Sequence, residues 1–492
     1  MSIKIVKNYV NGQWQEAQNT DYLDVENPST GKILAKTPLS SKAEVNEAID
    51  AAYEAYKSWK SLPVSRRVQP LYKLVDLLRQ NEDKIARLLV AEMGKSITDA
   101  IAEMKRIFEN IEVACGMPVL QQGDKLIGAS FDIDGEVIRL PLGVFAMVAP
   151  FNFPGMVPFW FLPYALATGN TYIVKASEQV PLTMQLITEY IDQCDFPPGV
   201  FNLVNGNKVI AETFVESPKI KGVSLVGSSN TCRIIAKKCA NTNKRFQAMG
   251  AAKNHLVAMP DAKMGEMIRN MITSSYGCAG QRCMASSAIV AVGDDLYKEV
   301  CEKFIKASKE VIVADPLDPK VADKPMVMGP VISAKSKKFI LEMIEKGINE
   351  GATLALDGRD LVIPGCEKGH FVGPTVFTDV KPDMEIHNTE IFGPVVVILK
   401  TDTLDEAIKI INEHQYGNGA SIYTQSGYWA RRFKLETECG MIGINVGIPA
   451  PVSYLPFGGM KKSLYCDIKA QGKAVINFFT EDKIITERYL PE

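Results

Sequence analysis

The stretch LGVFAMVAPFNFP (142–154), followed by TYIVKAS (171–177), decides the fold class of this chain. Residues 140–174 carry no charge, and that length alone would suit a membrane-spanning helix. Helical hydrogen bonding is, however, interrupted at Pro141, Pro150, Pro154, Pro158 and Pro163. We therefore expect a buried strand that ends in a loop, and no membrane span.

The sequence downstream alternates between helical and strand patterns. Val157 to Thr168 suits a buried helix that ends at Gly169-Asn170, and TYIVKAS suits a second strand. The next segments read in turn as helix, strand, helix and strand: SEQVPLTMQLITEYIDQ (177–193), GVFNLV (199–204), AETFVES (211–217) and GVSLVGS (222–228). Units of this length predict an α/β fold with a parallel sheet.

A second alternating section follows His255. Its strand and helix patterns are SSAIVAVG (286–293), Asp295–Val311, Ser333–Gly351, TLALDG (353–358), FVGPTVFTDV (371–380) and PVVVILK (394–400). The section predicts a second α/β domain. Upstream of residue 120 we expect two short strands, KNYVNGQW (7–14) and LDVENPSTG (23–31), and then helices over 41–113 that pack against the first sheet.

Two further segments alternate like edge strands: SFDIDGEVIRL (130–140) and AVINFFTEDKIITERY (474–489). We expect them to lie outside both cores.

Composition narrows the function classes. The 492 residues include 55 Lys plus Arg against 57 Asp plus Glu, a net charge of −2, which argues against nucleic acid or an anionic membrane as partner. The ten cysteines form no C-x-x-C and the four histidines no H-E-x-x-H, so no metal is expected. Unpaired cysteines and an N-terminus without a signal-peptide pattern indicate the cytoplasm.

The best candidate nucleophile is Cys283 in GCAGQRC (277–283). Glycines let backbone amides approach, and the neighbouring Arg282 is expected to favour the thiolate. A cysteine is more often a buried structural thiol, so this signal is weak alone, and Cys278 is a second candidate.

A polar side chain in another loop supports Cys283 as the candidate nucleophile. Asn152, in APFNFP (149–154), follows a strand at the place where open α/β sheets bind ligands. It is either a loop-bracing amide or a donor aimed at a reacting oxygen. VGSS (226–229) ends a strand and opens a helix, which is a common phosphate-binding pattern.

Together these motifs resemble the aldehyde dehydrogenase superfamily over essentially the whole chain. The matching landmarks, in order, are NPSTG (27–31), APFNFP (149–154), TGN (168–170), KASE (175–178), VGSS (226–229), GQRC (280–283), EIFGP (390–394) and PFGG (456–459). The chain is most similar to the CoA-acylating methylmalonate/malonate semialdehyde dehydrogenase branch. That resemblance rests on FNFPGMVPFW, GAAKNH, AGQRCMA, GINVGIPAPV and PFGGMKKS.

The resemblance implies two Rossmann-like parallel-sheet domains and a small β arm for oligomerisation. Residues 1–120 and 141–250 would form the NAD-binding domain, and residues 251–466 the catalytic domain. Residues 121–140 and 467–492 would form the arm and tail, which implies a homo-oligomer, a dimer or a tetramer.

By residue-for-residue match, Cys283 would be the nucleophile, and Asn152 with the Cys283 N–H would form the oxyanion hole. The NAD site would comprise Lys175 and Glu178 at the adenosine ribose, Ser228 at the pyrophosphate, Glu390 and Phe392 at the nicotinamide riboside, and Ala149, Phe151 and Gln179 along the groove. Taken without the resemblance, Lys175 and Glu178 read as a solvated pair. Glu178 would repel a 2′-phosphate, so NAD is expected over NADP.

Two positions depart from the family pattern. Met249 stands where most of the superfamily has a water-activating Glu in E-L-G-G-K, and methionine cannot act as a base. The thiol of coenzyme A could then take the acyl group, as in the CoA-acylating branch. Cys232 stands where relatives usually have Gly, which puts the local helix packing in question.

The branch holds its substrate carboxylate with two arginines that match Arg106 and Arg282. Helical periodicity places Arg106 opposite an apolar stripe, on a face with Glu103 and Glu109, so a solvated arginine paired to either glutamate is the alternative. Arg282 could equally be part of a structural ion pair.

The sequence thus predicts an NAD-dependent enzyme that oxidises methylmalonate or malonate semialdehyde through a Cys283 thioester. Decarboxylation and transfer to CoA would give propionyl-CoA or acetyl-CoA. The alternatives are a hydrolytic NAD(P)-dependent aldehyde dehydrogenase that releases free acid, a cysteine acyl transferase without nicotinamide, and a catalytically inactive structural protein.

Overall fold

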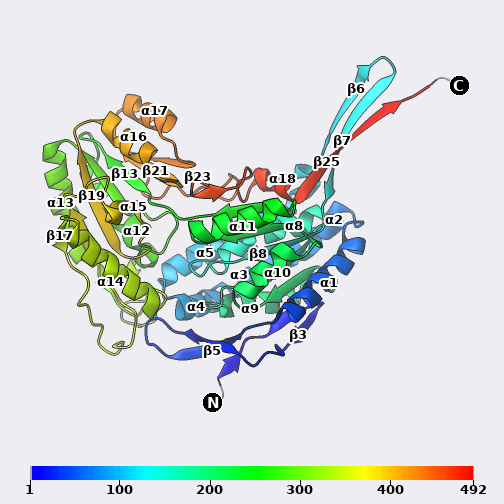
Figure 1. The fold of residues 1–492 in the computed structure, drawn as a ribbon, viewed down its shortest axis with the longest axis horizontal. Coiled ribbons are helices and arrows are strands. Elements are labelled where there is room, and N and C mark those ends of the chain that lie inside the picture. Colours follow the sequence, from blue (N-terminus) through cyan, green and yellow to red (C-terminus); the bar gives the residue numbers. More distant parts are fainter. Residues whose placement is uncertain (1–2, 491–492) are drawn as a thin grey trace.

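A computed structural model describes residues 3–490 of the chain. Two largely parallel sheets with helices packed against them stand side by side, and a thin three-stranded arm projects from the molecule (Figure 1). This architecture confirms the predicted α/β class with two parallel-sheet units and a β arm. Among the residues described, no helix is long and apolar enough to cross a membrane.

The first sheet has the strand order β24-β12-β11-β8-β9-β10-β2-β3. Its strands are β2 (Asn8–Val10), β3 (Gln13–Gln15), β8 (Val144–Val148), β9 (Thr171–Lys175), β10 (Phe201–Val204), β11 (Ile220–Val226), β12 (Arg245–Met249) and β24 (Leu464–Tyr465). The strands from β12 to β10 run parallel, and the short strands at the two edges are antiparallel.

Strand β8 is buried on both faces, as its unbroken apolar sequence predicts. Phe145 and Met147 belong to a core with α3, α5, α8 and α9, whereas Val144 and Ala146 belong to a core with α1, α10 and α11. The helices of this half are α1 (Lys42–Trp59), α2 (Val64–Arg67), α3 (Gln69–Gln80), α4 (Glu82–Met93), α5 (Ile97–Cys115), α6 (Met117–Leu120), α7 (Met156–Phe159), α8 (Leu162–Thr168), α9 (Leu182–Ile191), α10 (Lys208–Glu216) and α11 (Ser229–Asn241).

The helix expected over 157–168 is two helices. Helix α7 ends at Phe159 and α8 begins at Leu162, with Pro163 in the first turn of α8. A proline in a first turn loses no helical hydrogen bond, so here it starts a new helix instead of kinking an old one.

The N-terminal segment forms two small features. Strands β2 and β3 are joined at Asn11 (φ 52°) and Gly12 (φ 75°), and two successive positive φ angles are typical of a tight hairpin turn. Strands β1 (Lys4–Ile5), β4 (Tyr22–Glu26) and β5 (Ile33–Pro38) form a separate three-stranded sheet.

The second sheet has the order β17-β18-β19-β14-β13-β21-β22 and is parallel apart from β17. Its strands are β13 (His255–Ala258), β14 (Ala288–Val292), β17 (Thr353–Leu356), β18 (Thr375–Thr378), β19 (Val395–Thr401), β21 (Gly419–Tyr423) and β22 (Met441–Ile444). Its helices are α12 (Met264–Tyr276), η1 (Gly277–Gly280), α13 (Asp294–Lys309), α14 (Ala334–Asn349), α15 (Glu385–Asn388), α16 (Leu404–Glu413) and α17 (Gly427–Glu436). Two short strand pairs lie outside it: β15 (Ile312–Val313) with β16 (Val327–Met328), and β20 (Tyr416–Gly417) with β23 (Met460–Lys461).

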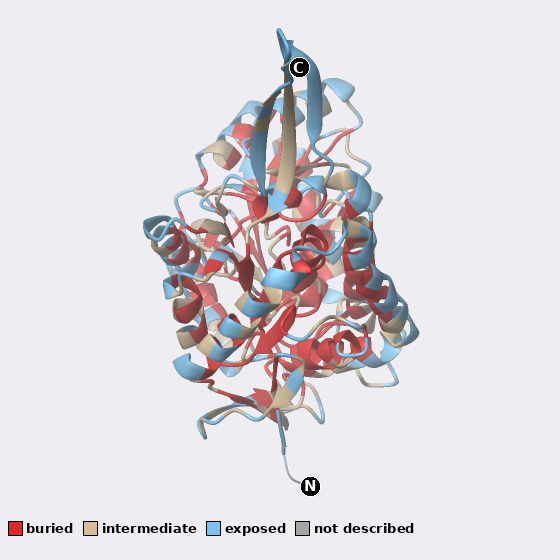
Figure 2. Cartoon of the chain, turned by 90° about the vertical axis from the view of Figure 1, so that its right-hand side faces the viewer, coloured by how far each residue is buried: buried red, intermediate tan, exposed pale blue. Residues whose placement is uncertain are grey.

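The arm consists of β6 (Asp124–Ser130), β7 (Ile133–Pro141) and β25 (Thr480–Arg488), all antiparallel. It is far more exposed than the two sheets (Figure 2). The expectation of a strand over 474–489 is wrong at its start, because η2 (Lys473–Val475) and α18 (Ile476–Phe479) precede β25. Phe478 and Phe479 pack edge-on against Phe145 of the first sheet, and this burial overrides the alternating pattern.

The domain boundaries given from the sequence stay a prediction. Strand β24, within the range assigned to the second domain, pairs with β12 of the first sheet.

Candidate active site

Neighbouring strands of the first sheet end at a common edge. Val148 is in register with both Lys175 and Leu225, and Val226 is in register with Met249. The loops that leave this edge therefore begin side by side, and they carry APFNFP (149–154), KASE (175–178), VGSS (226–229) and MGAAK (249–253). Ligands of open α/β sheets bind at such an edge.

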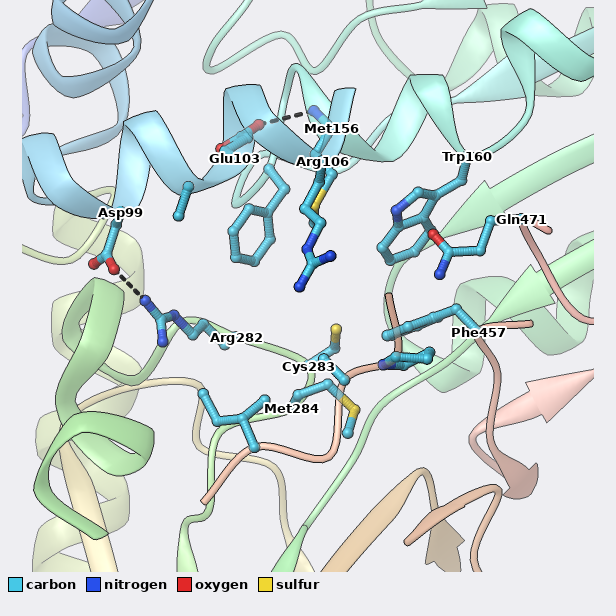
Figure 3. Close-up of a pocket in the computed structure, with 15 residues that line it drawn as sticks. Asp99, Glu103, Arg106, Met156, Trp160, Arg282, Cys283, Met284, Phe457 and Gln471 are labelled. Atoms are coloured by element: carbon cyan, nitrogen blue, oxygen red, sulfur yellow. Dashed lines mark hydrogen bonds and ion pairs between the residues drawn. The ribbon is translucent and has the colours of Figure 1, made fainter. Parts of the chain in front are cut away.

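Cys283 lines a cavity of about 200 Å³ together with Met156 and Trp160, which follow β8 (Figure 3). The cavity is built from α5, the loop after β8, residues 277–283 (the cysteine loop) and residues 448–457. Much of its wall is apolar, and Trp160 and Phe457 lie with ring centroids 4.3 Å apart. A small aldehyde fits a pocket of this size and chemistry.

The backbone of the cysteine loop adopts an unusual conformation. Cys278, Ala279 and Gly280 have φ angles of 52°, 53° and 72°, and left-handed geometry costs about 1–2 kcal/mol at a non-glycine residue. Gln281 braces the turn, because its Nε2 donates to the Cys278 carbonyl (3.1 Å) and its Oε1 accepts from Ile332 N (2.9 Å).

Two amide side chains from the second sheet fix Cys283 itself. Asn254 Nδ2 and Asn418 Nδ2 each donate to the Cys283 carbonyl oxygen at 2.9 Å. Sequence reasoning missed both residues. Asn254 lies inside the GAAKNH motif, so its position there was an available signal, whereas Asn418 had none.

The thiol of Cys283 is difficult to ionise. Burial and, to a smaller extent, the Glu390 carboxylate raise its pKa to about 12, while Arg282 lowers it only weakly. Arg282 therefore acts on Cys283 in the expected direction, toward the thiolate, but its effect is smaller than that of burial. The Arg282 side chain extends toward Asp99, away from Cys283 (Figure 3), and its Nε donates to Cys278 Sγ (3.3 Å).

Asp99 of α5 is the partner of Arg282, with Oδ1 2.5 Å from Nη2. Burial opposes ionisation of Asp99, but Arg282 and Lys95 outweigh it and hold the pKa of the carboxyl below its ordinary value. Arg282 thus forms the structural ion pair foreseen as an alternative, and it also lines the cavity.

Arg106 points into the cavity toward Cys283 (Figure 3). Its Nη1 donates to Glu109 Oε2 (2.6 Å), and that oxygen also accepts from Ser453 Oγ (3.0 Å). The pair with Glu109 confirms one alternative taken from periodicity. The helix face is only partly open to water, because the Arg106 and Glu109 side chains are 36% and 30% exposed whereas Glu103 and Asn110 are buried.

Asn152 is buried beside the cysteine loop. Its Nδ2 donates to the Gln281 carbonyl at 3.0 Å, which uses one of its two N–H groups and leaves the other free for a ligand.

The predicted cofactor residues fall into two groups, and the first contains Lys175, Glu178, Gln179 and Ser228. Lys175 is buried and forms an ion pair with the half-buried Glu178, while Gln179 is exposed. Ser228 is the exposed N-cap of α11, where its Oγ accepts from Thr231 N (3.3 Å).

The second group of predicted cofactor residues contains Glu390, Phe392, Phe151 and Ala149. Glu390 Oε1 accepts from Ala252 N (2.7 Å), and burial raises its pKa to about 7. Phe392, with a φ of 55°, meets Phe151 edge-to-face at 5.8 Å, and Ala149 lies buried two residues earlier.

The two departures from the family pattern meet at the end of β12. The Met249 side chain is buried, and its carbonyl accepts from Gly227 N (3.0 Å) and Cys232 Sγ (3.1 Å). Cys232 is therefore accommodated in the first turn of α11 with its thiol bonded.

Sequence reasoning did not find Lys95 and gave Glu103 only a surface role. Both are buried, and they form an ion pair at 2.6 Å beneath the Asn152 loop. Periodicity shows which residues share a helix face but not what covers the face, so no local signal marked them.

Comparison with known proteins places this site in a family. The sequence matches the aldehyde dehydrogenase family over residues 14–485, and the chain belongs to that family. It is 40% identical to malonate-semialdehyde dehydrogenase 1 of Geobacillus kaustophilus (strain HTA426), over 99% of this chain and 98% of that protein. It is 39% identical to malonate-semialdehyde dehydrogenase of Listeria monocytogenes serotype 4a (strain HCC23), with the same coverage.

Solved structures agree. A protein described as a methylmalonate-semialdehyde dehydrogenase from Sinorhizobium meliloti 1021, in complex with NAD, superposes with a TM-score of 0.97 at 36% identity and covers 100% of this chain and 99% of its own. Methylmalonate-semialdehyde dehydrogenase from Oceanimonas doudoroffii gives a TM-score of 0.96 at 36% identity, with the same coverage.

Proposed function

We propose that this protein is an NAD-dependent, CoA-acylating dehydrogenase of malonate or methylmalonate semialdehyde, with Cys283 as nucleophile. The observation that carries the proposal is that Cys283 shares one small cavity with the inward-pointing Arg106. A thiol below a guanidinium suits an aldehyde that also bears a carboxylate. Relatives with about 40% identity that are named malonate-semialdehyde dehydrogenases support the substrate class.

The chemistry begins at the Cys283 sulfur. After losing its proton to solvent, the sulfur adds to the aldehyde carbon, and the resulting oxyanion accepts hydrogen bonds from Asn152 Nδ2 and the Cys283 N–H. Loss of hydride from that carbon re-forms the carbonyl as a thioester. Arg106 and Arg282 hold the substrate carboxylate during these steps.

The chain's residues fit NAD as the hydride acceptor. The first turn of α11, capped by the exposed Ser228, offers N–H groups to a pyrophosphate. Lys175 and Glu178 offer a donor and an acceptor to ribose hydroxyls, and Glu178 disfavours a 2′-phosphate. Glu390 and Phe392 would hold the nicotinamide riboside, and Ala149, Phe151 and Gln179 would line the groove.

Release of the acyl group requires a nucleophile other than activated water. Met249 has no basic group, so the thiol of CoA is the better acceptor for the acyl group. A carboxylate β to the thioester carbonyl leaves as carbon dioxide, because the thioester takes up the electron pair as an enolate. Protonation of that enolate and transfer to CoA then yield acetyl-CoA or propionyl-CoA.

A rapid-mixing experiment tests this proposal. Enzyme, NAD and malonate semialdehyde without CoA should give a burst of NADH near one equivalent per site and then slow, and CoA should restore steady turnover. Cys283→Ala should give no NADH while it still binds NAD, because the assigned cofactor contacts do not use the thiol.

Product analysis separates the alternatives. Equally fast turnover without CoA, with free acid released, would instead establish a hydrolytic aldehyde dehydrogenase. Absence of NADH under all conditions would point to an acyl transferase or an inactive protein. Met249→Glu should raise CoA-independent turnover if its carboxylate reaches the thioester.

The remaining assignments are part of the same proposal. Residues 1–120 and 141–250 would bind NAD, residues 251–466 would carry the nucleophile, and residues 121–140 and 467–492 would join subunits into a dimer or tetramer. The ten free cysteines suit the reducing cytoplasm.

A further inference from the structure

Lys95 and Glu103 form an ion pair from which water is excluded. Their side chains are 0% exposed, with Nζ 2.6 Å from Oε2. Lys95 lies in the turn between α4 and α5, and Glu103 lies two turns into α5. Removing two charges from water is costly, and apolar side chains of similar volume often stabilise a fold as well or better. Stability alone therefore does not account for this pair.

Both charges are directed at the loop that follows β8. Lys95 Nζ donates to the backbone carbonyl of Asn152 (2.7 Å), and its ammonium lies 3.9 Å from the ring centroid of Phe153. Glu103 Oε1 accepts from the N–H groups of Gly155 and Met156, each at 2.9 Å. The pair thus holds the segment 152–156 at both of its ends.

The close approach of this segment to α5 depends on a glycine. A Cβ added at Gly155 would lie 3.0 Å from Ile107 Cδ1 and 3.3 Å from Glu103 Oε1. The loop therefore rests directly on the helix that carries Glu103, and the Asn152 side chain of the same segment donates to the Gln281 carbonyl.

We propose that Lys95 and Glu103 are positioning residues that hold the Asn152 amide where the oxyanion forms on the Cys283 adduct. This inference rests on the proposed function. A donor to a developing oxyanion is effective only when it is fixed within a few tenths of an ångström, and the ion pair supplies that constraint through the Asn152 carbonyl and the backbone N–H groups of Gly155 and Met156. Neither residue transfers a proton or contacts a reacting atom.

A double-mutant cycle tests the inference in the full-length enzyme. The rate of the first NADH turnover is measured for wild type, Lys95→Met, Asn152→Ala and the double variant. Asn152→Ala should lower the rate by about 10²–10³-fold, as for other single oxyanion donors. Lys95→Met should lower it by at least tenfold. The double variant should be no more than about threefold slower than Asn152→Ala, because Lys95 acts through Asn152.

Other measurements separate positioning from general damage. Lys95→Met should keep the NAD dissociation constant and the KM for the aldehyde within about threefold of wild type. Arg87→Met, which breaks the exposed Arg87–Asp83 pair on α4, is the matched control and should leave the rate unchanged. If Lys95→Met fails to fold, Glu103→Gln, which keeps the shape and one acceptor oxygen, takes its place in the cycle.

The outcomes are distinct. Losses that multiply in the double variant, or full activity of both Lys95→Met and Glu103→Gln, would overturn the positioning role. Failure of the proposed function would show in the wild type itself, as absence of any NADH from the semialdehyde.

Discussion

Cys283 lies in surroundings that oppose its own ionisation. Burial raises the pKa of its thiol to about 12, compared with about 8.5 for an exposed cysteine, and Glu390 adds to the shift. The Cys283 side chain, the proposed nucleophile, therefore stays a thiol at neutral pH in the free protein.

Alkylation measures this directly. The rate at which iodoacetamide modifies the Cys283 peptide, followed by mass spectrometry, should still rise about tenfold per pH unit up to pH 10, because only the thiolate reacts. A plateau near pH 8 to 9 would contradict the pKa shift. Glu390→Gln should shift the whole profile to lower pH, since it removes the neighbouring negative charge.

The two arginines of the cavity differ in how many contacts their guanidinium groups already make within the protein. Arg282 is fixed by Asp99 and Cys278, whereas Arg106 projects toward Cys283 and is held only by Glu109. Leaving a carboxylate without its charged partner costs about 1.5–3 kcal/mol, which is roughly 10- to 150-fold.

Arg106→Leu should therefore reduce kcat/KM for malonate semialdehyde at least tenfold more than for propanal, which has no carboxylate. Arg282→Leu should reduce both, because it also releases the cysteine loop, with the larger loss on the semialdehyde. Equal loss on both aldehydes for Arg106→Leu would assign it a structural role only, and no loss would remove it from the site.

Among single residues, the sequence alone pointed to those that follow a strand or lie in a compact motif. Cys283 and Asn152 stood out because a nucleophile and an amide lie in glycine- or proline-rich loops. Lys95 and Asn418 could not be found this way, since their roles depend on backbone groups far away in the chain. The direction of the Arg282 side chain was likewise set by a partner on another helix.

Three of the four histidines come together from separate elements of the second half. His255 begins β13, His387 lies in α15 and His414 directly follows α16, and their ring centroids are 5.1–5.3 Å apart. Burial, His414 and Lys253 lower the pKa of His387 to about 3, and burial and Lys253 lower that of His414 to about 4. Burial, the two other histidines and Lys253 lower the pKa of His255 as well. The cluster is neutral in the folded protein.

This cluster predicts acid sensitivity with a definite sign. Below pH 6.5 the three histidines bind protons in the unfolded chain but stay neutral in the folded protein. The free energy of unfolding therefore falls as pH falls from 6.5 toward 4. Each histidine contributes about 1.4 kcal/mol per pH unit in that range. Urea unfolding of His414→Phe should show a shallower pH dependence than wild type between pH 6.5 and 5, and an identical slope would contradict the prediction.

Elements were predictable where local pattern and burial agree. Strands β8 to β11, β14 and β17 to β19 were, because a continuous apolar run between turn residues is typical of a buried strand, whereas β12, β13, β21 and β22 were not expected from the sequence. The pattern failed at 474–479, where alternating residues form a helical turn because Phe478 and Phe479 reach the core of the first sheet. Tertiary burial decided that segment, and sequence spacing could not reveal it.

In the whole molecule, the three-stranded arm is the part least stabilised by contacts within its own chain. A three-stranded sheet needs a hydrophobic face covered by other atoms to be stable. Here the arm projects with Ile127, Phe131 and Ile484 at 78%, 93% and 73% exposure, and β6 and β25 are both free edges (Figures 1 and 2). Such a surface is typical of a contact between subunits.

We therefore expect the arm to be covered by a second copy of the chain. Light scattering of the wild type should give a mass that is a multiple of 54.1 kDa, and Ile484→Lys should shift it toward 54.1 kDa, because a lysine in the centre of β25 would be buried without a partner. Ile234→Lys, at an exposed isoleucine on α11, controls for the added charge and should keep the wild-type mass. A monomeric wild type, or an unchanged mass for Ile484→Lys together with deletion of residues 480–492, would show that the arm serves another purpose.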